Sequence, residues 1–398
     1  MESKTSKYLV CVLFGGVSTE YSISLRSAYN VIGNLRQAGH EVMRVGISPE
    51  GQWLLFNGDD EDILKDRWLE VAQLDAAKAT ELKSTIEPKS AADTEGRFSK
   101  SKDSTQDNSA RRHSPLNYIL SITDRIPDLI FPIVHGINCE DGILQGLLEL
   151  TGIPYVGCNV TASAVGMDKR MSRELFKAAG IPVCKYLAVN RDGITHNFQG
   201  IAKETAEYIG YPCFIKPNNG GSSVGTCKVN GPEELEEALL SSSNYDYTIL
   251  IEEWVDAREI EIAVLGNDQP IFSMPGEIIK ADNVDYYDYK TKYLDTQSSY
   301  LQIPADISEE DRASLESFAL KAYKTLGCSG LSRIDFFLDK RDGRILLNEI
   351  NTIPGFTSIS LYPKAWELSG VAGPELVTRL CNYALDYKAS RQKDESFA

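Results

Sequence analysis

Two apolar segments joined by a turn, near the C-terminal end, constrain the fold of this chain more than any other part of its sequence. Residues 332–338 and 344–351 are rich in Ile, Leu and Phe, and the intervening KRDG has the residues of a turn. The two segments therefore predict a β-hairpin. Side chains alternate between the faces of a strand, so one face of this hairpin can pack on a core while the other carries polar groups.

The polar residues of the hairpin fall on one predicted face. A tight turn sets Arg333 opposite Glu349 and Asp335 opposite Leu347. Strand alternation then points Arg333, Asp335, Glu349 and Asn351 the same way. The other face is predicted to be core and carries Ile334, Phe336, Leu338, Leu346 and Ile350. Charged groups on a half-buried sheet are costly unless they are paired or bind a metal.

The residues alone leave two interpretations of this polar face open. Asp335, Glu349 and the amide oxygen of Asn351 are hard oxygen ligands of the kind that Mg²⁺ prefers. Alternatively, Arg333 and Glu349 form an ordinary salt bridge between two strands on a solvated face, since structural ion pairs also cluster.

Bulk composition narrows the class of protein. With 398 residues and 42% hydrophobic content, we expect two or three domains with a sizeable core. The net charge of −16 argues against a nucleic-acid partner, which needs a basic surface. No apolar stretch approaches membrane-spanning length, and the N-terminus MESKTSK lacks the apolar segment of a signal peptide. Eight scattered cysteines without a CxxC pair indicate buried reduced thiols in a cytoplasmic α/β enzyme.

The order of predicted elements indicates an α/β fold. Residues 8–16 are predicted to form a buried strand, residues 18–39 a helix and residues 40–48 the next strand, which is a βαβ opening. Residues 89–115 are poor in apolar residues and rich in Ser, Lys and Asp, so we expect a disordered surface insertion there. Residues 162–180 are predicted to form one helix that ends at a glycine.

A loop rich in glycine and serine is a candidate phosphate site. In FIKPNNGGSSVG, Lys216 ends a strand and is followed by a loop that contains Ser222, Ser223 and Gly225. Glycines let backbone N–H groups approach a phosphate, and serine hydroxyls add donors. Lys169, early in a helix in MDKRMS, would supply a second cation. A flexible hairpin loop and a solvated lysine are the alternatives.

Acidic residues beside an aromatic residue form a second candidate site. IEEWVDAREIE places Glu252 and Glu259 around Trp254. The carboxylates could accept from an adenine amine or ribose hydroxyls, and the indole could form an apolar wall. The alternative is an ordinary acidic strand edge. In YYDYKTKY, Lys292 and Tyr293 lie in a loop of a composition that could close over a nucleotide, or simply be solvated.

Two further motifs follow predicted strands, where α/β proteins place their ligands. In FGGVSTEYSISLRS, Glu20 lies in the first turn of a helix, where a carboxylate stays ionised and suits a substrate ammonium. A helix-capping role is the alternative for this residue. HGINCEDG supplies His135 and Glu140, for which a structural turn with a satisfied histidine is the alternative.

Eight segments in this order resemble the D-alanine–D-alanine ligases of the ATP-grasp superfamily. They are GGVSTEYSISLRS, HGINCEDG, MDKRMS, IKPNNGGSSVG, EEWVDAREIE, YDYKTKY, GLSRIDFF and NEINTIPGFTS. The resemblance covers nearly the whole chain except the insertion and the two tails. It implies an α/β (α+β) ATP-grasp fold with an N-terminal Rossmann-like domain at residues 1–160, which contains the insertion at about residues 76–116. A central subdomain with the glycine-rich loop at 161–251, a C-terminal subdomain with the metal site at 252–390 and a tail at 391–398 would follow.

The resemblance also implies roles for individual residues. ATP would be bound by Lys169, Lys216, Ser222, Ser223, Gly225, Glu252, Trp254, Glu259 and Lys292. Two Mg²⁺ ions, for which Mn²⁺ can substitute, would be held by Asp335, Glu349 and Asn351. The catalytic groups would be Glu20, Ser222, Tyr293 and Arg333. The amino-acid substrates would contact Glu20, His135, Ser360 and Leu361.

The activity implied by the resemblance is ATP-dependent ligation of two D-alanine molecules through D-alanyl phosphate, for peptidoglycan synthesis, by a cytoplasmic homodimer. Tyr293 and Leu361 favour D-alanine at the second position over D-lactate and D-serine, which related ligases use. Ile359 departs from the family, because many relatives carry His there. The alternatives are a ligase for D-serine or D-lactate, another ATP-grasp carboxylate–amine ligase, and a nucleotide-binding regulatory protein without turnover.

Overall fold

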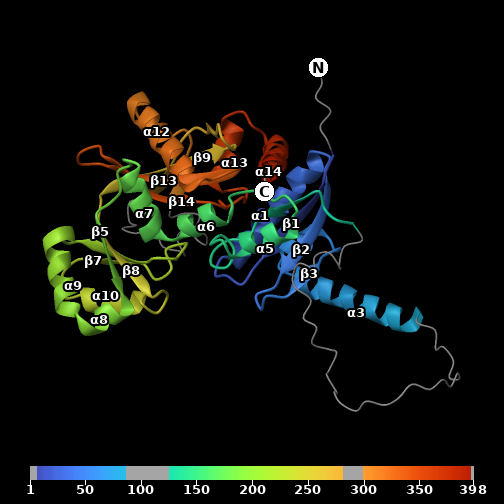
Figure 1. Ribbon diagram of the computed structural model, residues 1–398, viewed down its shortest axis with the longest axis horizontal. Coiled ribbons are helices and arrows are strands. Elements are labelled where there is room, and N and C mark those ends of the chain that lie inside the picture. The colour runs from blue at the N-terminus through green and yellow to red at the C-terminus, as the bar shows by residue number, and fades with distance from the viewer. Residues whose placement is uncertain (1–6, 87–124, 281–298, 396–398) are drawn as a thin grey trace, which may run out of the picture.

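Three β-sheets, formed one after another along the chain, organise the residues that the computed structural model describes, 7–86, 125–280 and 299–395 (Figure 1). The first sheet has the order β3-β2-β1-β4 and consists of β1 (Leu9–Gly15), β2 (Glu41–Ile47), β3 (Trp53–Leu55) and β4 (Leu129–Pro132). β1 pairs in parallel with both β2 and β4. Every residue of β1 is buried, which explains its unbroken apolar sequence.

The helices of the first sheet confirm the predicted βαβ opening. They are α1 (Tyr21–Gln37), α2 (Asp60–Leu64), α3 (Trp68–Ile86) and α5 (Ile143–Thr151). α1 connects the parallel strands β1 and β2. Because α3 runs to Ile86, a helix occupies the start of the segment expected to be a disordered insertion; residues 87–124 lie outside the described residues. After α5, the chain makes one isolated parallel bridge to β4, between Tyr155 and Ile130.

The middle sheet is antiparallel and has the order β5-β8-β6-β7. Its strands are β5 (Tyr186–Asn190), β6 (Cys213–Pro217), β7 (Cys227–Val229) and β8 (Thr248–Glu253). The short helices α8 (Arg191–His196), α9 (Phe198–Glu204), η2 (Thr205–Ile209) and α10 (Leu235–Ser242) lie beside this sheet (Figure 1). Their apolar side chains share a separate core with it, around Ile215 and Ile251. This core is what makes the middle sheet a unit of its own.

The third sheet carries the predicted hairpin. Its order is β12-β11-β9-β13-β14, with β10 also paired to β9. The strands are β9 (Ala257–Leu265), β10 (Ile271–Phe272), β11 (Gly276–Lys280), β12 (Ser299–Gln302), β13 (Leu331–Asp339) and β14 (Ile345–Asn351). The remaining helices among the described residues are α6 (Val160–Met167), α7 (Lys169–Ala178), α12 (Glu309–Leu326), α13 (Leu361–Leu368) and α14 (Gly373–Glu395).

The hairpin forms, but the predicted register is wrong. A β-bulge shifts the pairing between Asp335 and Phe336, so Asp335 lies opposite Glu349 and Arg333 lies opposite Asn351. The shared polar face survives, because the extra residue of the bulge, Asn348, restores the alternation beyond it. One core assignment changes as a result. Ile345, Leu347 and Ile350 join the core cluster with Ile334, Phe336 and Leu338, whereas Leu346 pairs with Phe337 on the other side.

Residues 162–180 form two helices instead of the single one predicted. Asp168 separates α6 from α7, and its side chain accepts a hydrogen bond of 2.8 Å from the N–H of Met171. An aspartate with extended backbone is a favourable N-cap, so a new helix begins directly at Lys169. The break therefore determines where this lysine points.

Several elements extend or pack across the predicted domain boundaries. Ala162 and Phe176, from α6 and α7, pack in the core of the third sheet and not with the middle sheet. β8 extends to Glu253, past the boundary placed at residue 251. α14 continues to Glu395, and Arg391 forms an ion pair of 3.0 Å with Glu149, so the start of the expected tail is helical.

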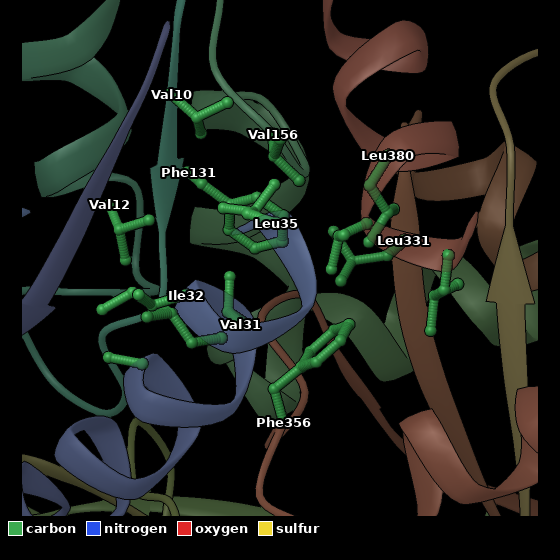
Figure 2. Packing of buried hydrophobic residues seen from close by; sticks show 14 of the residues in the cluster. Val10, Val12, Val31, Ile32, Leu35, Phe131, Val156, Leu331, Phe356 and Leu380 are labelled. Atoms are coloured by element: carbon green, nitrogen blue, oxygen red, sulfur yellow. The ribbon is translucent and has the colours of Figure 1, made fainter. Parts of the chain in front are cut away.

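The N-terminal sheet and the last helix share one core (Figure 2). Val31 and Leu35 of α1 and Phe131 of β4 pack in the same cluster as Leu331 of β13 and Leu380 of α14. Burial of each such side chain stabilises the fold by about 1.5–3 kcal/mol. This core joins the loops after β1 and β4 to the hairpin, and thereby fixes the distance between the segments that carry the candidate site.

Two expectations from composition can be compared with the structure. All eight cysteines are free and seven of them are buried, which confirms the interpretation as buried thiols. Within the described parts of the chain, no helix has the length and apolar character needed to cross a membrane.

Candidate functional site

Two adjacent cavities collect most of the predicted site residues. The first contains about 690 Å³ of empty space, counted to its open mouth, and the second about 1020 Å³. Predicted residues that line the first are Glu20, His135, Lys169, Ser222, Arg333, Glu349 and Asn351. Predicted residues that line the second are Lys169, Lys216, Ser222, Ser223, Glu252, Trp254, Glu259 and Glu349. Lys169, Ser222 and Glu349 belong to both, so the two cavities meet at these side chains.

Lys169 is fixed at this junction by the segment before the glycine-rich loop. The backbone N–H of Lys169 donates to the carbonyl of Asn218 (3.2 Å), and the N–H of Arg170 donates to the Asn218 side chain (2.8 Å). The ammonium of Lys169 donates to the carbonyl of Gly220 and lies 3.9 Å from the carboxylate of Glu349. Burial lowers the pKa of Lys169, while the charge of Glu349 raises it. A cation at this point faces both cavities.

A buried ion-pair triad forms one wall of the second cavity. Glu252 lies between Arg173, at 2.7 Å, and Lys216, at 3.1 Å. The Arg173 and Glu252 side chains are each 1% exposed. Burial alone would raise the pKa of Glu252, but the charges of Arg173 and Lys216 outweigh it and lower the pKa to about 2. The carboxylate is therefore ionised and holds the Lys216 ammonium in place.

The mouth of the second cavity combines aromatic and acidic side chains. Trp254 lines the cavity, and the ammonium of Lys228 lies 4.7 Å from the centre of its indole. Glu259 of β9 lies opposite Phe337 of β13, and both side chains line the cavity. An apolar wall with carboxylates at its edge can bind a flat heterocycle that carries hydrogen-bond donors.

The glycine-rich loop contains two serines in an unusual conformation. Ser222 and Ser223 have positive φ angles of 51° and 58°, which cost energy in residues that have a Cβ atom. Gly225 (φ 72°) cannot be replaced easily, because a Cβ atom there would lie 2.6 Å from Tyr245. The hydroxyl of Ser222 donates to Glu20, which joins this loop to the N-terminal end of α1. Backbone N–H groups in such turns make concave anion sites.

Glu20 lies at the N-cap position of α1 and is 7% exposed. Its side chain does not cap the helix, so the capping alternative is excluded. The backbone at Gly136 and at Gly221 approaches the Glu20 carboxylate closely, from two sides. A Cβ atom at Gly136 would lie 2.7 Å from the carboxylate, and one at Gly221 would lie 3.2 Å from it. Glu20 is therefore presented to the first cavity in a fixed orientation.

His135 lines the first cavity, but both ring nitrogens already have partners. Nδ1 lies 3.0 Å from the carbonyl of Ile353, and Nε2 lies 3.3 Å from the hydroxyl of Ser27. The carbonyl can only accept, so these contacts assign the proton to Nδ1. Burial lowers the pKa of His135, although the charge of Glu20 raises it, and the ring is neutral. This arrangement confirms the satisfied histidine that was the alternative for this motif.

Glu140 lines the first cavity as well. Its carboxyl oxygen accepts a 3.1 Å hydrogen bond from the N–H of Gly136. Burial is the main cause that raises the pKa of Glu140 well above its ordinary value, and the charge of Glu20 is the second. The Glu140 carboxyl is thereby held toward its neutral form beside the carboxylate of Glu20.

On the polar face of the hairpin, Arg333 pairs with carboxylates other than Glu349. Its Nε and Nη2 atoms donate to the two oxygens of Asp335, both at 2.7 Å, and Nε lies 3.1 Å from Glu261. Asn351 donates to Asp335 at 3.0 Å. The predicted salt bridge between Arg333 and Glu349 is therefore not the pairing that forms.

The donor set of this face fits a hard divalent cation. Asp335 and Glu349 lie directly opposite each other on neighbouring strands, and the amide of Asn351 adjoins Asp335. Carboxylate and amide oxygens are the ligands that Mg²⁺ takes. Across the described residues, no three His, Cys, Asp or Glu side chains already have metal-ligand spacing. Asp335 is held by Arg333 and Asn351, so a metal bound to it would share its oxygens with these donors.

Some of the predicted site residues are not found on the cavity linings. Ser360 bonds Thr357 through its hydroxyl (3.1 Å to the backbone N–H), and Leu361 packs in the core shared with the N-terminal sheet; neither lines the two cavities. Lys292 and Tyr293 lie outside the described residues. Sequence reasoning missed Arg173 and Glu261. The signal for Arg173 was its i, i+4 spacing from Lys169, which places both side chains on one face of α7.

The chain matches known proteins of one family. Two family models match the chain, one described as the D-ala D-ala ligase N-terminus over residues 9–158 and one as the D-ala D-ala ligase C-terminus over residues 175–382. The D-alanine–D-alanine ligases of Acetivibrio thermocellus and Ruminiclostridium cellulolyticum are 41% and 42% identical to the chain, over 379 residues (95% of this chain and 96% of that one) and 390 residues (98% of each) respectively.

Two solved structures have the same fold as the chain. A D-Ala:D-Ser ligase from Enterococcus faecalis has a TM-score of 0.75 and 34% identity, over 95% of this chain and 100% of that one. The D-alanine–D-alanine ligase from Coxiella burnetii has a TM-score of 0.73 and 32% identity, over 97% and 98% respectively.

Proposed function

The chain belongs to the D-alanine–D-alanine ligase family, and on this basis we propose that it uses ATP to join two molecules of D-alanine. Its fold is that of the ATP-grasp ligases, as the resemblance implied. One observation carries the proposal for this chain: a cavity suited to a nucleotide and a cavity suited to an amino acid meet at Lys169 and Glu349. A phosphoryl group bound at this junction is within reach of ligands in both cavities.

ATP occupies the second cavity. Lys169 and Lys216 neutralise its phosphates, and the loop of Ser222 and Ser223 covers them with backbone and hydroxyl donors. The support is the placement of both ammonium groups on the cavity lining, with Lys216 held by buried Glu252. Adenosine lies toward Trp254 and Glu259, where the wall is apolar and the edge acidic. Gly225 keeps the turn tight, and Lys292 adds a further contact to ATP.

Mg²⁺ is held by Asp335, Glu349 and Asn351, and Mn²⁺ can substitute for it. When bound, the metal supplies charge that neutralises the phosphates of ATP and the oxygens of the transferred group. The hard donor set and the position of Glu349 at the junction of the cavities support this assignment.

The first D-alanine binds in the first cavity with its ammonium on Glu20. A carboxylate that is buried, oriented and bonded to Ser222 is a suitable partner for a small ammonium. His135 is neutral and shapes the cavity wall through Ser27 and Ile353. The resemblance assigns Glu20, Ser222 and Tyr293 to a network that would close the site; Ser222 donates to Glu20, and Tyr293 lies outside the described residues.

The reaction then has two steps. An oxygen of the bound D-alanine carboxylate attacks the γ-phosphorus, ADP leaves, and an acyl phosphate forms. The amine of the second D-alanine loses a proton and attacks the acyl carbon, and phosphate leaves with the oxygen that came from the carboxylate. Positioning and charge do most of the work in such a transfer. Exclusion of water matters because water would hydrolyse the acyl phosphate.

Arg333 stabilises the oxyanion of the tetrahedral intermediate. Its guanidinium lines the first cavity and is a permanent cation, because its pKa lies far above neutrality. Charged donors that are fixed before the reaction stabilise a transition state without reorganisation. The ion pair of Arg333 with the buried carboxylate of Glu261, at 3.1 Å, supports such a fixed position.

D-alanine is the second substrate. The resemblance attributes this preference to Tyr293. Ser360 and Leu361 act on the second subsite from outside the cavity lining, since Ser360 ties the loop at Thr357 and Leu361 packs below it. The competing candidate is D-serine, because a D-Ala:D-Ser ligase shares the fold at 34% identity. An apolar pocket rejects an added hydroxyl only weakly, so slow use of D-serine is expected.

The product serves peptidoglycan synthesis, and the enzyme works in the cytoplasm as a homodimer. Its requirement for ATP and its free thiols support the cytoplasm, since thiols stay reduced there.

The domain boundaries that we propose separate the first sheet with its helices, the middle sheet from Tyr186 to Glu253, and the third sheet.

Release of phosphate tests the proposal. Purified protein, ATP and Mg²⁺ are incubated with and without D-alanine, and the products are separated by mass. D-alanine-dependent phosphate with D-alanyl-D-alanine in equal amount is the expected result. Release that does not depend on D-alanine, or no release, refutes the ligase. D-alanyl-D-serine as the main product, when D-alanine and D-serine compete at equal concentration, refutes the substrate assignment alone.

A further inference from the structure

A buried carboxylate that sequence reasoning did not single out lies behind Arg333. Glu261, in β9, is 5% exposed and lies directly opposite Asp335 on β13. Its Oε2 atom is 3.1 Å from the Nε atom of Arg333. Like charges directly opposite across two strands repel each other, so the guanidinium near both carboxylates is what makes this pairing tolerable.

The oxygens of Asp335 are already engaged. Oδ2 accepts from Nη2 of Arg333 at 2.7 Å and from Nδ2 of Asn351 at 3.0 Å, while Oδ1 accepts from Nε of Arg333. A carboxylate oxygen has about two lone-pair sites. Oδ2 can therefore ligate a metal only if one of these two donors turns away, and a metal on Oδ1 would share that oxygen with Nε of Arg333.

We infer that Glu261 is the positioning residue that would keep the Arg333 guanidinium in the first cavity when Asp335 is engaged by a metal. The inference rests on the proposed function, because it takes Asp335 as a metal ligand and Arg333 as the group that stabilises the oxyanion. Glu261 is not among the proposed ligands. Its strand is paired on both sides, to β11 at Gly276 and to β13 at Asp335, so its backbone is fixed in either state.

Loss of the Glu261 charge has two consequences. Arg333 loses a fixed anion, so its guanidinium is held less firmly in the cavity and stabilises the oxyanion less. Arg333 also binds Asp335 more strongly, and this competes with the metal. The first effect lowers kcat, and the second raises the Mg²⁺ concentration that the protein needs. The nucleotide cavity is unaffected, because Glu261 is not part of its lining.

Glu261→Gln tests the inference in the full-length protein. It keeps the size of the side chain and removes the charge. We expect kcat to fall about 10- to 100-fold, the usual range for residues that orient the groups of a metal site, with the KM for ATP within about twofold. Calorimetry of ADP binding at a series of Mg²⁺ concentrations supplies a readout without turnover. The half-saturating Mg²⁺ concentration is expected to rise about threefold or more.

Glu277→Gln is the matched control. Glu277 has the same exposure as Glu261 and lies in the neighbouring strand, but it pairs with Arg258 (2.7 Å) outside both cavities. Its variant should melt at a lower temperature with unchanged kcat and Mg²⁺ dependence. Equal kcat losses in the two variants, or a Glu261→Gln variant within twofold of the wild type in both readouts, would overturn the inference.

Two further measurements keep these outcomes distinct. If Glu261→Gln shows no melting transition, Glu261→Asp replaces it. This variant keeps the charge on a side chain that is shorter by one methylene group. Its kcat and its half-saturating Mg²⁺ concentration are then judged by the same limits. The wild type is assayed beside each variant. A wild type without D-alanine-dependent phosphate release refutes the proposed function itself, whereas an active wild type with an unimpaired variant refutes only the role of Glu261.

Discussion

The buried triad of Arg173, Glu252 and Lys216 allows a prediction with a worked magnitude. Arg173→Met removes the guanidinium and keeps a long apolar side chain. At 2.7 Å and an effective dielectric constant of about 20, the attraction between Arg173 and Glu252 is about 6 kcal/mol, from which the loss of hydration subtracts. The fall of the Glu252 pKa from 4.5 to about 2 corresponds to about 3 kcal/mol. We therefore expect Arg173→Met to lower the free energy of unfolding by about 3 kcal/mol, the lower end for a broken buried pair.

Urea denaturation at pH 7 measures this loss, and a double-mutant cycle with Glu252→Gln isolates the pair. Either single variant leaves a buried charge with fewer partners. The loss of unfolding free energy in the double variant should therefore be smaller than the sum of the two single losses, by about 2 kcal/mol or more. Arg379→Met, which breaks a partly exposed pair with Glu375 on α14, is the control and should cost less than about 1 kcal/mol. A loss below about 1 kcal/mol for Arg173→Met, or additive losses in the cycle, would refute the triad as a source of stability.

The same triad predicts the pH dependence of stability. The folded pKa of Glu252 lies below its ordinary value, so its contribution is complete above about pH 4.5 and is lost as the pH falls toward 2. Arg173→Met raises the folded pKa of Glu252, so the difference in unfolding free energy between wild type and variant should shrink over this acid range. A difference that stays constant between pH 5 and pH 3 would contradict the assignment.

Three further predictions concern the cavities. Lys169→Met should lower kcat/KM for ATP at least about 100-fold in steady-state assays, because it removes the cation shared by both cavities, whereas Lys177→Met on the exposed side of α7 should not. Gly136→Ala would place a Cβ atom 2.7 Å from the carboxylate of Glu20 and should raise the KM for D-alanine about tenfold; Gly39→Ala has the same kind of positive φ without such a contact and should leave it unchanged. Glu349→Gln should abolish turnover with an unchanged circular dichroism spectrum, and measurable turnover would refute its role as a metal ligand.

The sequence was sufficient to predict the polar face of the hairpin, because strand alternation is local. It was not sufficient for the register. The bulge at Asp335 and Phe336 moved Glu349 from Arg333 to Asp335, and no residue in the turn signals it. Glu261 was missed for a related reason. Its partner strand begins 70 residues later, at Leu331, and only the assembled sheet brings the two carboxylates face to face.

The motifs for the nucleotide and the amino acid were found as separate segments. Their arrangement depends on contacts between distant parts of the chain: Asn218 holds the start of α7, and Ser222 bonds Glu20 across 202 positions of sequence. The apolar core that joins α1 to α14 fixes both loops in space. Composition and periodicity predicted which elements form, but the meeting of the cavities at Lys169 and Glu349 follows from the packing of the three sheets.

Transfer of oxygen from D-alanine to phosphate is the most direct test of the account. D-alanine labelled with ¹⁸O in its carboxylate is incubated with unlabelled ATP, Mg²⁺ and the protein, and the released phosphate is analysed by mass spectrometry. An acyl phosphate formed at the junction of the cavities leaves one labelled oxygen in each phosphate released with the dipeptide. Phosphate without label, at normal dipeptide yield, would contradict the proposed reaction.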